Sequence, residues 1–342
     1  MIDKNESDLE EKKPRGVVAC LTLGFDVAAR YPQLSLLPIL LDLYLWLGPR
    51  LSLEPLLRQF QVVWNEVLRS PDVPEVSGAY QTLNQMIEEV AQSYNLFSFL
   101  ESFPLLSVPT LMGQRLTVAR PFGPRPAIPV DNLALALVWI CVIVMIGLGL
   151  SAIYLWRIGL ASSSVTETPI PGPQEPTRIW GSLLKLLFWL FVSLLVLGMP
   201  ALFATSMLSF ISMGVSGFIL TVILSIGAFV LLHALFTIPS VVQFKRHPLQ
   251  AIRESFILTR ADFPGTLGLL LIILVISQGL NFVWTTPEPE SWATLVGISG
   301  HALVSTALMT TLFIFYQERV AYLKMLKQVY ATSTAQSQAD TS

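Results

Sequence analysis

Residues 186–244 contain no Asp, Glu, Lys or Arg, and this uncharged run constrains the fold more than any other feature of the sequence. Lys185 precedes the run, and Lys245 and Arg246 follow it. A helix needs about 20 apolar residues to cross the hydrocarbon core of a bilayer, so the run accommodates two helices and the turn between them. Charged side chains are unfavourable at that depth, which accounts for their absence. The run therefore predicts a polytopic membrane protein.

The composition of the whole chain agrees with a membrane class. Hydrophobic residues make up 53% of the 342 positions and charged residues 13%, whereas soluble domains carry about 25% charged residues. The net charge of −2 gives no indication of a nucleic-acid-binding surface. Cys20 and Cys141 are too few and too far apart for a disulfide framework or a cysteine metal site. We therefore expect the lipid bilayer and other membrane proteins as partners, and neither nucleic acid nor a bound metal.

Apolar stretches of suitable length recur along the chain and predict an all-α fold with six transmembrane helices. The run itself is expected to break where Gly, Pro and Ser concentrate, at 198–200 and 206–214. Residues 17–330 form the membrane domain in this interpretation, between a polar arm at 1–16 and a polar tail at 331–342 that are both expected to be disordered. The predicted spans are residues 31–50, 133–156, 183–200, 213–241, 265–284 and 292–316.

Residues 51–130 form a long region of mixed polarity. Apolar residues at helical spacing predict two amphipathic helices there, one after a cap at Ser52 and one after Ser77. Residues 104–129 are rich in proline and are expected to be irregular. Each helix has an apolar face that needs to be covered, either by the other helix or by the membrane surface.

The distribution of Lys and Arg predicts the orientation of the chain in the membrane. Basic residues cluster before the first span, between the second and third, between the fourth and fifth, and after the sixth. The short turns at about 201–212 and 285–291 contain none. Because basic loops are retained on the cytoplasmic side, both termini are expected to be cytoplasmic and region 51–130 extracytoplasmic, in a plasma membrane protein.

A short amphipathic helix is predicted at residues 248–260, directly before the span at 265–284. Pro248 suits the first turn of such a helix. Arg253, Phe256 and Arg260 are candidate anchors at the membrane interface, since an apolar ring can enter the headgroup region and Arg side chains can extend to the headgroups.

The same segment carries a family resemblance. It fits the pattern Ala-x-x-x-Ser-x-x-Leu-x-Arg, followed by an aromatic residue and a span, with Ala251, Ser255, Leu258 and Arg260 at the defined positions. About residues 251–275 thus resemble the membrane domain attached to some bacterial glycerophosphodiester phosphodiesterases, and related uncharacterised polytopic families. The resemblance implies an architecture only. The chemistry of that family belongs to a separate soluble barrel with His-Arg-Gly and Glu-rich metal motifs, which are absent here, so no catalytic residue carries over.

Asp42, Gln278 and His301 form a candidate polar cluster inside the membrane. Counted from the middle of their predicted spans, the three residues fall at one depth, slightly toward the outer side. An unpaired carboxylate there costs at least about 2.5–3.5 kcal/mol, so Asp42 should have a partner, and His301 is the proposed one, with Gln278 nearby. The alternative is that Asp42 reaches water at the outer headgroups beside Tyr44 and Arg50.

No motif of the common catalytic or nucleotide-binding types is found. The sequence contains no His-Glu-x-x-His, Cys-x-x-Cys, Gly-x-Ser-x-Gly or Gly-x-x-x-x-Gly-Lys. We therefore expect a non-enzymatic protein without a cofactor, acting as a scaffold or as an accessory subunit of a membrane complex. The alternative is a small transporter or a permease-like subunit, in which polar groups converge near the midplane.

Overall fold

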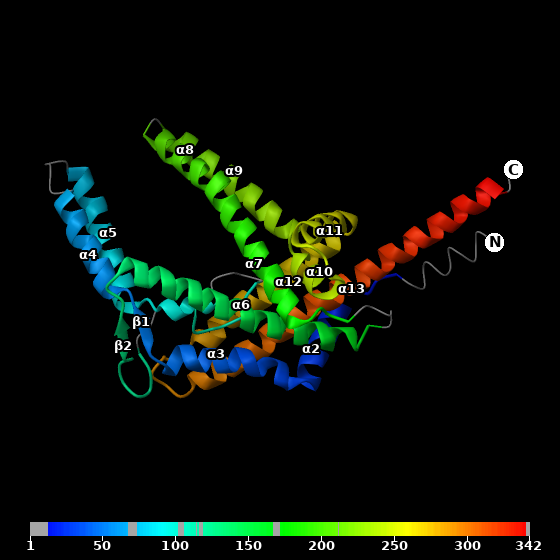
Figure 1. The fold of residues 1–342 in the computed structure, drawn as a ribbon, viewed down its shortest axis with the longest axis horizontal. Helices are drawn as coiled ribbons and strands as arrows, with labels where there is room; N and C mark the ends of the chain where they lie inside the picture. The colour runs from blue at the N-terminus through cyan, green and yellow to red at the C-terminus, as the bar shows by residue number, and fades with distance from the viewer. Residues whose placement is uncertain are drawn as a thin grey trace. The chain divides into compact units, whose positions relative to one another are not determined.

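The computed structural model describes residues 13–67, 74–101, 106–113, 115, 119–166, 172–210 and 212–339 (Figure 1). Most of these residues are helical, which confirms the predicted all-α class. Within the described ranges, five helical segments are long and apolar enough to cross a membrane, which indicates a multi-pass membrane protein. These segments are Leu133–Ser163, Pro176–Ser209, Met213–Phe244, Phe263–Thr285 and Thr294–Val329.

The chain divides into two compact units, each described here by itself. Unit 1 comprises Met1–Tyr31, Leu155–Val275 and Ala307–Ser342, and unit 2 comprises Pro32–Tyr154 and Ile276–Thr306. The described elements, in chain order, are α2 (Val17–Arg30), η1 (Pro32–Ser35), α3 (Leu36–Leu47), β1 (Arg50–Ser52), α4 (Glu54–Val67), α5 (Pro74–Ser93), η2 (Leu96–Leu100), β2 (Ala127–Pro129), α6 (Leu133–Ser163), α7 (Pro176–Ser193), η3 (Leu194–Gly198), α8 (Met199–Ser209), α9 (Met213–His233), α10 (Thr237–Phe244), α11 (Pro248–Ala261), α12 (Phe263–Thr285) and α13 (Thr294–Ala339).

The core of unit 1 lies where α9 gives way to α10. The rings of Phe236 and Phe315 stack there, with their centroids 5.8 Å apart. Ser255 of α11 closes the bend, because its hydroxyl accepts a hydrogen bond from the Phe236 N–H at 3.0 Å and donates one to the His233 carbonyl. Gly24 permits close packing of α2 on α13, since a Cβ at that position would lie 2.0 Å from the Thr311 hydroxyl. These contacts fix the short helices against the membrane-spanning ones.

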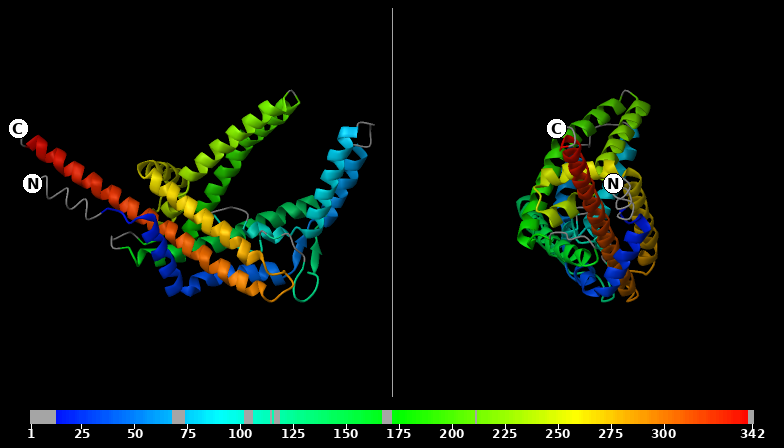
Figure 2. Two further views of the ribbon diagram at one scale, coloured as in Figure 1. Left: turned by 180° about the vertical axis from the view of Figure 1, so that it is seen from behind. Right: turned by 90° about the vertical axis from the view of Figure 1, so that its right-hand side faces the viewer.

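The uncharged run forms two long helical segments, and α8, at the end of the first, lies side by side with α9, at the start of the second (Figures 1 and 2). The predicted break at 198–200 is wrong, because the helix continues through the π-helical turn η3 into α8. A wide turn accommodates the missing N–H of Pro200 without ending the helix. The segment turns after Ser209 instead, and Ser212 caps α9 by accepting from the Val215 N–H at 3.4 Å. Almost none of the most apolar part of either segment is buried in protein, as expected for helices in contact with lipid.

Unit 2 contains a pair of short parallel strands that sequence reasoning missed. β1 and β2 pair in the register Arg50 with Ala127 and Ser52 with Pro129, and β2 lies inside the stretch 104–129 that was expected to be irregular. β1 is buried and β2 is exposed. Near the end of α3, Trp46 is buried and donates its indole N–H to the Pro289 carbonyl at 2.8 Å. The strands thus join the end of α3 to the segment that enters α6.

Several predicted boundaries can be compared with the observed helices. The predicted first span at 31–50 corresponds to the apolar helix Pro32–Leu47, which is shorter than the five long segments. The second amphipathic helix begins at Pro74 and not after Ser77, since Pro suits the first helical turn. The predicted disordered tail at 331–342 is helical as far as Ala339 in α13. Most of the predicted arm at 1–16 lies outside the described residues.

Candidate interaction surface

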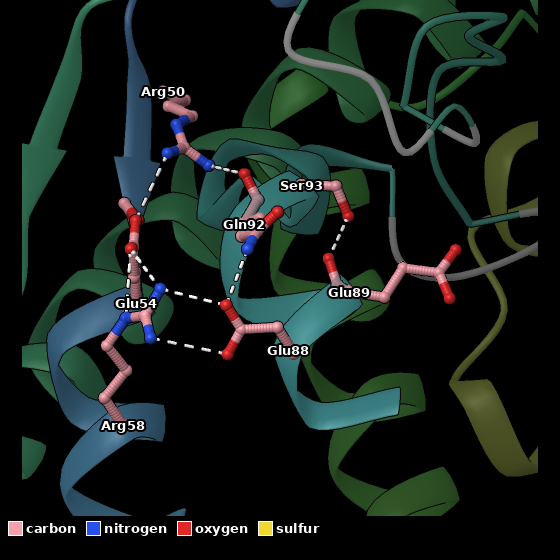
Figure 3. Close-up of polar contacts among 8 residues, drawn as sticks. Arg50, Glu54, Arg58, Glu88, Glu89, Gln92 and Ser93 are labelled. Carbon is pink, nitrogen blue, oxygen red and sulfur yellow. Dashed lines mark hydrogen bonds and ion pairs between the residues drawn. The ribbon is translucent and has the colours of Figure 1, made fainter. Parts of the chain in front are cut away.

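Helices α4 and α5 form a hairpin outside the five long apolar segments, and polar side chains join the two helices. Arg58 of α4 lies 3.0 Å from Glu88 of α5 and 3.1 Å from Glu54 one turn earlier in its own helix (Figure 3). The Gln61 side-chain amide donates to the side-chain amide oxygen of Asn84 at 3.2 Å. Hydrogen bonding to Glu54, together with the charge of Glu88, raises the pKa of Arg58. These contacts between charged and amide side chains therefore hold α4 and α5 together.

The base of the hairpin is fixed to β1. Arg50 lies 3.5 Å from Glu54 and donates to the Gln92 carbonyl, so one guanidinium contacts both helices (Figure 3). The Asn95 side chain accepts from the Leu51 N–H at 3.0 Å and from the Phe97 N–H at 3.2 Å. The Ser52 hydroxyl accepts from the Glu54 N–H at 3.2 Å, one residue before the N-cap position of α4, where the cap was predicted. These bonds hold both ends of the hairpin at one place.

Large apolar side chains of the hairpin remain exposed. Val62, Val63 and Met86 are 65%, 60% and 59% exposed, and Phe60 and Val90 are also exposed. We refer to these five residues as the hairpin surface. Large apolar side chains that stay exposed outside a membrane span indicate contact with a protein or a membrane. The sequence left open whether the apolar faces of these helices are covered by each other or by the membrane surface. In the structure α4 and α5 pair with each other, and the hairpin surface remains uncovered.

The structure places Asp42 in a different contact from the predicted pair with His301. The Asp42 side chain is 0% exposed, and its carboxylate accepts hydrogen bonds from the Leu111 N–H at 2.8 Å and from the Met112 N–H at 2.7 Å. Among the described residues no hydrogen bond or ion pair joins Asp42 to His301 or to Gln278. Two consecutive backbone N–H groups supply the partner that a buried carboxylate needs.

The other two residues of the predicted cluster lie in separate surroundings. His301 contacts the hydroxyl of Ser305, one turn along α13, at 3.3 Å. Gln278 is exposed on α12. The alternative for Asp42, access to water beside Tyr44 and Arg50, does not agree with its complete burial.

Other polar side chains of the long helices are also used in internal contacts. Tyr154 of α6 donates to Thr306 of α13 at 3.2 Å within unit 2. In unit 1, Gln317 of α13 donates to the Ser162 hydroxyl at 2.9 Å and accepts from Thr166 at 3.0 Å. Such pairs satisfy buried polar groups and fix the contact between neighbouring helices. No group of His, Cys, Asp and Glu side chains suited to a metal ion occurs in the part of the chain that the structure describes.

The candidate interfacial anchors all lie on α11, whose bounds agree closely with the predicted helix at 248–260. Arg253 and Arg260 are exposed. Phe256 is half-buried, and its ring packs against His233 with the centroids 4.9 Å apart. The ring therefore contributes to packing between α9 and α11, while the two guanidinium groups remain available to a ligand or to lipid.

These features define a multi-pass helical membrane protein. It carries a hairpin of two helices that are held together by polar side chains and that expose large apolar side chains. Comparison with protein-family models, with curated proteins and with solved structures finds no match to the chain. The resemblance of residues 251–275 to phosphodiesterase membrane domains accordingly stays a prediction from sequence.

Proposed function

We propose that the chain is a scaffold or accessory subunit of a membrane complex, and that the hairpin surface is where it contacts another membrane protein. The observation that carries this proposal is the exposure of five large apolar side chains on a hairpin whose base is fixed by Arg50 and Asn95. A fixed, partly apolar surface loses little conformational freedom on binding, which favours association with a partner.

The intramembrane polar residues support this role over transport. A transporter gathers several polar groups at one binding site near the midplane. Asp42, Tyr154 and Gln317 each have a hydrogen-bond partner within the protein. Their bonding capacity is used to hold helices and loops together, which suits a structural protein.

Photo-crosslinking on the hairpin tests the proposed role. A photoreactive amino acid in place of Met86 is expected to give one discrete protein adduct in native membranes. The matched control is Gln92, which is also exposed on α5 but lies about 120° around the helix from Met86. A protein adduct at Met86 and none at Gln92 supports the proposal. Adducts of lipid only at Met86, or equal protein adducts at both positions, contradict it.

The proposal includes an orientation in the plasma membrane, with six spans and both termini cytoplasmic. The clusters of Lys and Arg in the loops that are predicted to be cytoplasmic support this topology. Pro32–Leu47 is the sixth span in this arrangement, and at about 1.5 Å per residue it crosses a membrane only if the bilayer is locally thin or polar flanking groups extend outward.

Cysteine labelling tests the orientation. In a Cys20→Ala, Cys141→Ala background, an impermeant thiol reagent applied outside cells is expected to label Glu89→Cys but neither Lys13→Cys nor Ser164→Cys. The reverse pattern inverts the topology. Labelling of Lys13→Cys together with Glu89→Cys shows instead that Pro32–Leu47 does not cross. Permeabilised cells, in which all three positions should react, provide the control.

A further inference from the structure

Unit 1 contains a cavity of about 400 Å³ between α10, α11 and the C-terminal part of α13. A sharp reversal of the chain builds its rim, since Lys245 adopts a left-handed conformation with φ 55° and joins α10 to α11. The residues that line the cavity are Phe244, Arg246, Gln250, Arg253, Glu254, Ile257, Leu258, Tyr316, Val320, Leu323, Lys324 and Lys327.

The charge of this cavity is strongly positive. Four of the lining residues are basic, and Glu254 is the only acidic one among them. Glu254 is already engaged, because it lies 2.8 Å from Arg246 and accepts from Ser240 at 3.0 Å. Three cationic groups therefore remain without a neutralising carboxylate.

The positions of those three groups leave them available to a ligand. Lys324 lies over the ring of Phe244, with its Nζ 4.5 Å from the ring centroid. Arg253 and Lys327 are exposed and make no hydrogen bond or ion pair with the residues that the structure describes. Like charges that converge without a counterion favour binding of an anion.

The remaining wall of the cavity is apolar and lies next to an interfacial helix. Tyr316, Val320 and Leu323 come from the last part of a membrane-spanning segment. Leu249 and Ile257 of α11 are exposed, as expected for a helix whose apolar side rests in the headgroup region. The cavity thus combines a cationic rim with an apolar wall at one boundary of the membrane.

We propose that this cavity binds the phosphate headgroup of an anionic phospholipid. Arg253 can donate two N–H groups to a phosphate, while Lys324 and Lys327 supply point charges. The apolar wall fits the glycerol and first acyl carbons, which distinguishes a lipid from a free phosphate ester. Basic pockets between membrane helices are suited to such headgroups. The site does not depend on which leaflet it faces.

Titration of the delipidated full-length protein in detergent tests this site, with native mass spectrometry and thermal unfolding as readouts. Short-chain phosphatidylglycerol is expected to bind at one copy per chain and to raise the unfolding temperature. Phosphatidylcholine should not. The Arg253→Gln, Lys327→Gln double variant should bind about 25-fold more weakly, at about fivefold per lost charge. Both residues are exposed, so the lipid-free unfolding temperature should be unchanged.

Arg260→Gln is the matched control, because Arg260 is exposed on the same helix but does not line the cavity. It should bind phosphatidylglycerol as the unaltered protein does. Equal loss in Arg260→Gln, or equal binding of phosphatidylcholine, overturns the site. Stabilisation by glycerol phosphate or inorganic phosphate to the same extent as by phosphatidylglycerol assigns the cavity to a soluble anion and overturns the lipid.

Discussion

Asp42→Ala is expected to destabilise unit 2 by roughly 3 kcal/mol or more, because it leaves two buried N–H groups without an acceptor and each such group costs about 1–3 kcal/mol. The groups belong to Leu111 and Met112. Thermal unfolding in detergent should show the loss directly. Asp42→Asn should cost less, since its carbonyl oxygen still accepts a hydrogen bond although the charge is lost.

Asp131→Ala is the control for this prediction, since Asp131 is an exposed acid of the same unit. Its unfolding temperature should match that of the unaltered protein. Asp42→Asn and His301→Gln should have additive effects, because the two side chains have separate partners. Non-additive effects in this double-mutant cycle would support the predicted Asp42–His301 pair. An unchanged unfolding temperature in Asp42→Ala would contradict the stabilising role of the carboxylate.

Arg319→Met is expected to produce the second large effect, in unit 1. Arg319 is 6% exposed, lies 3.0 Å from Asp262 and donates to the Arg15 carbonyl. Its guanidinium also stacks 3.5 Å from the centroid of Phe315. Removing one partner of a buried ion pair costs about 3–5 kcal/mol. The lower end of that range is expected, since Asp262 is partly exposed.

Cys20 provides a local readout for the Arg319 variant. Its thiol is buried beside Arg319, and burial raises the pKa of Cys20 to about 11, although the charge of Arg319 acts in the opposite direction. Because thiolates are the reactive form, Cys20 should react slowly at neutral pH and faster once the packing loosens. In a Cys141→Ala background, Arg319→Met should therefore accelerate labelling of Cys20.

Two further variants separate the ion pair from charge alone. Arg178→Met removes an exposed charge of the same unit and should leave stability and labelling unchanged. Arg319→Lys should be intermediate, since it retains the charge but not the planar fork of the guanidinium. If Arg319→Met behaves like Arg178→Met, the buried contact does not stabilise the fold.

The membrane class and most helices were predictable because their determinants are local. An uncharged run such as 186–244 has one physical explanation, and helical spacing located α4, α5 and α11 within a few residues. The helix through Pro200 was missed because a π-helical turn has no local signature that separates it from a break. The predicted helices thus differ from the observed ones mainly in where they begin and end.

The partners of polar residues were less accessible to sequence reasoning. The need of Asp42 for a partner followed from its apolar surroundings, but the partner is backbone, and any residue type at positions 111 and 112 other than proline would provide the same N–H groups. Of the four basic residues that line the cavity, only Arg253 was a candidate anchor from the sequence. Bringing Lys324 and Lys327 to the same place depends on how α13 packs on α11, which helical spacing does not encode.

The pairing of β1 with β2 closes the region between them into a loop whose two ends lie side by side. The strands meet where the chain leaves α3 and where it returns toward α6, and the Val130 N–H extends the ladder to the Ser52 carbonyl at 2.9 Å. Backbone hydrogen bonds therefore set the strand register. The side chains of Arg50, Asn95 and Asp42 then fix the base of the hairpin and residues 111–112. The part of the α4–α5 hairpin beyond these contacts can therefore change in length or surface chemistry without altering the strand register, so what the chain contacts there can vary while the membrane helices stay the same.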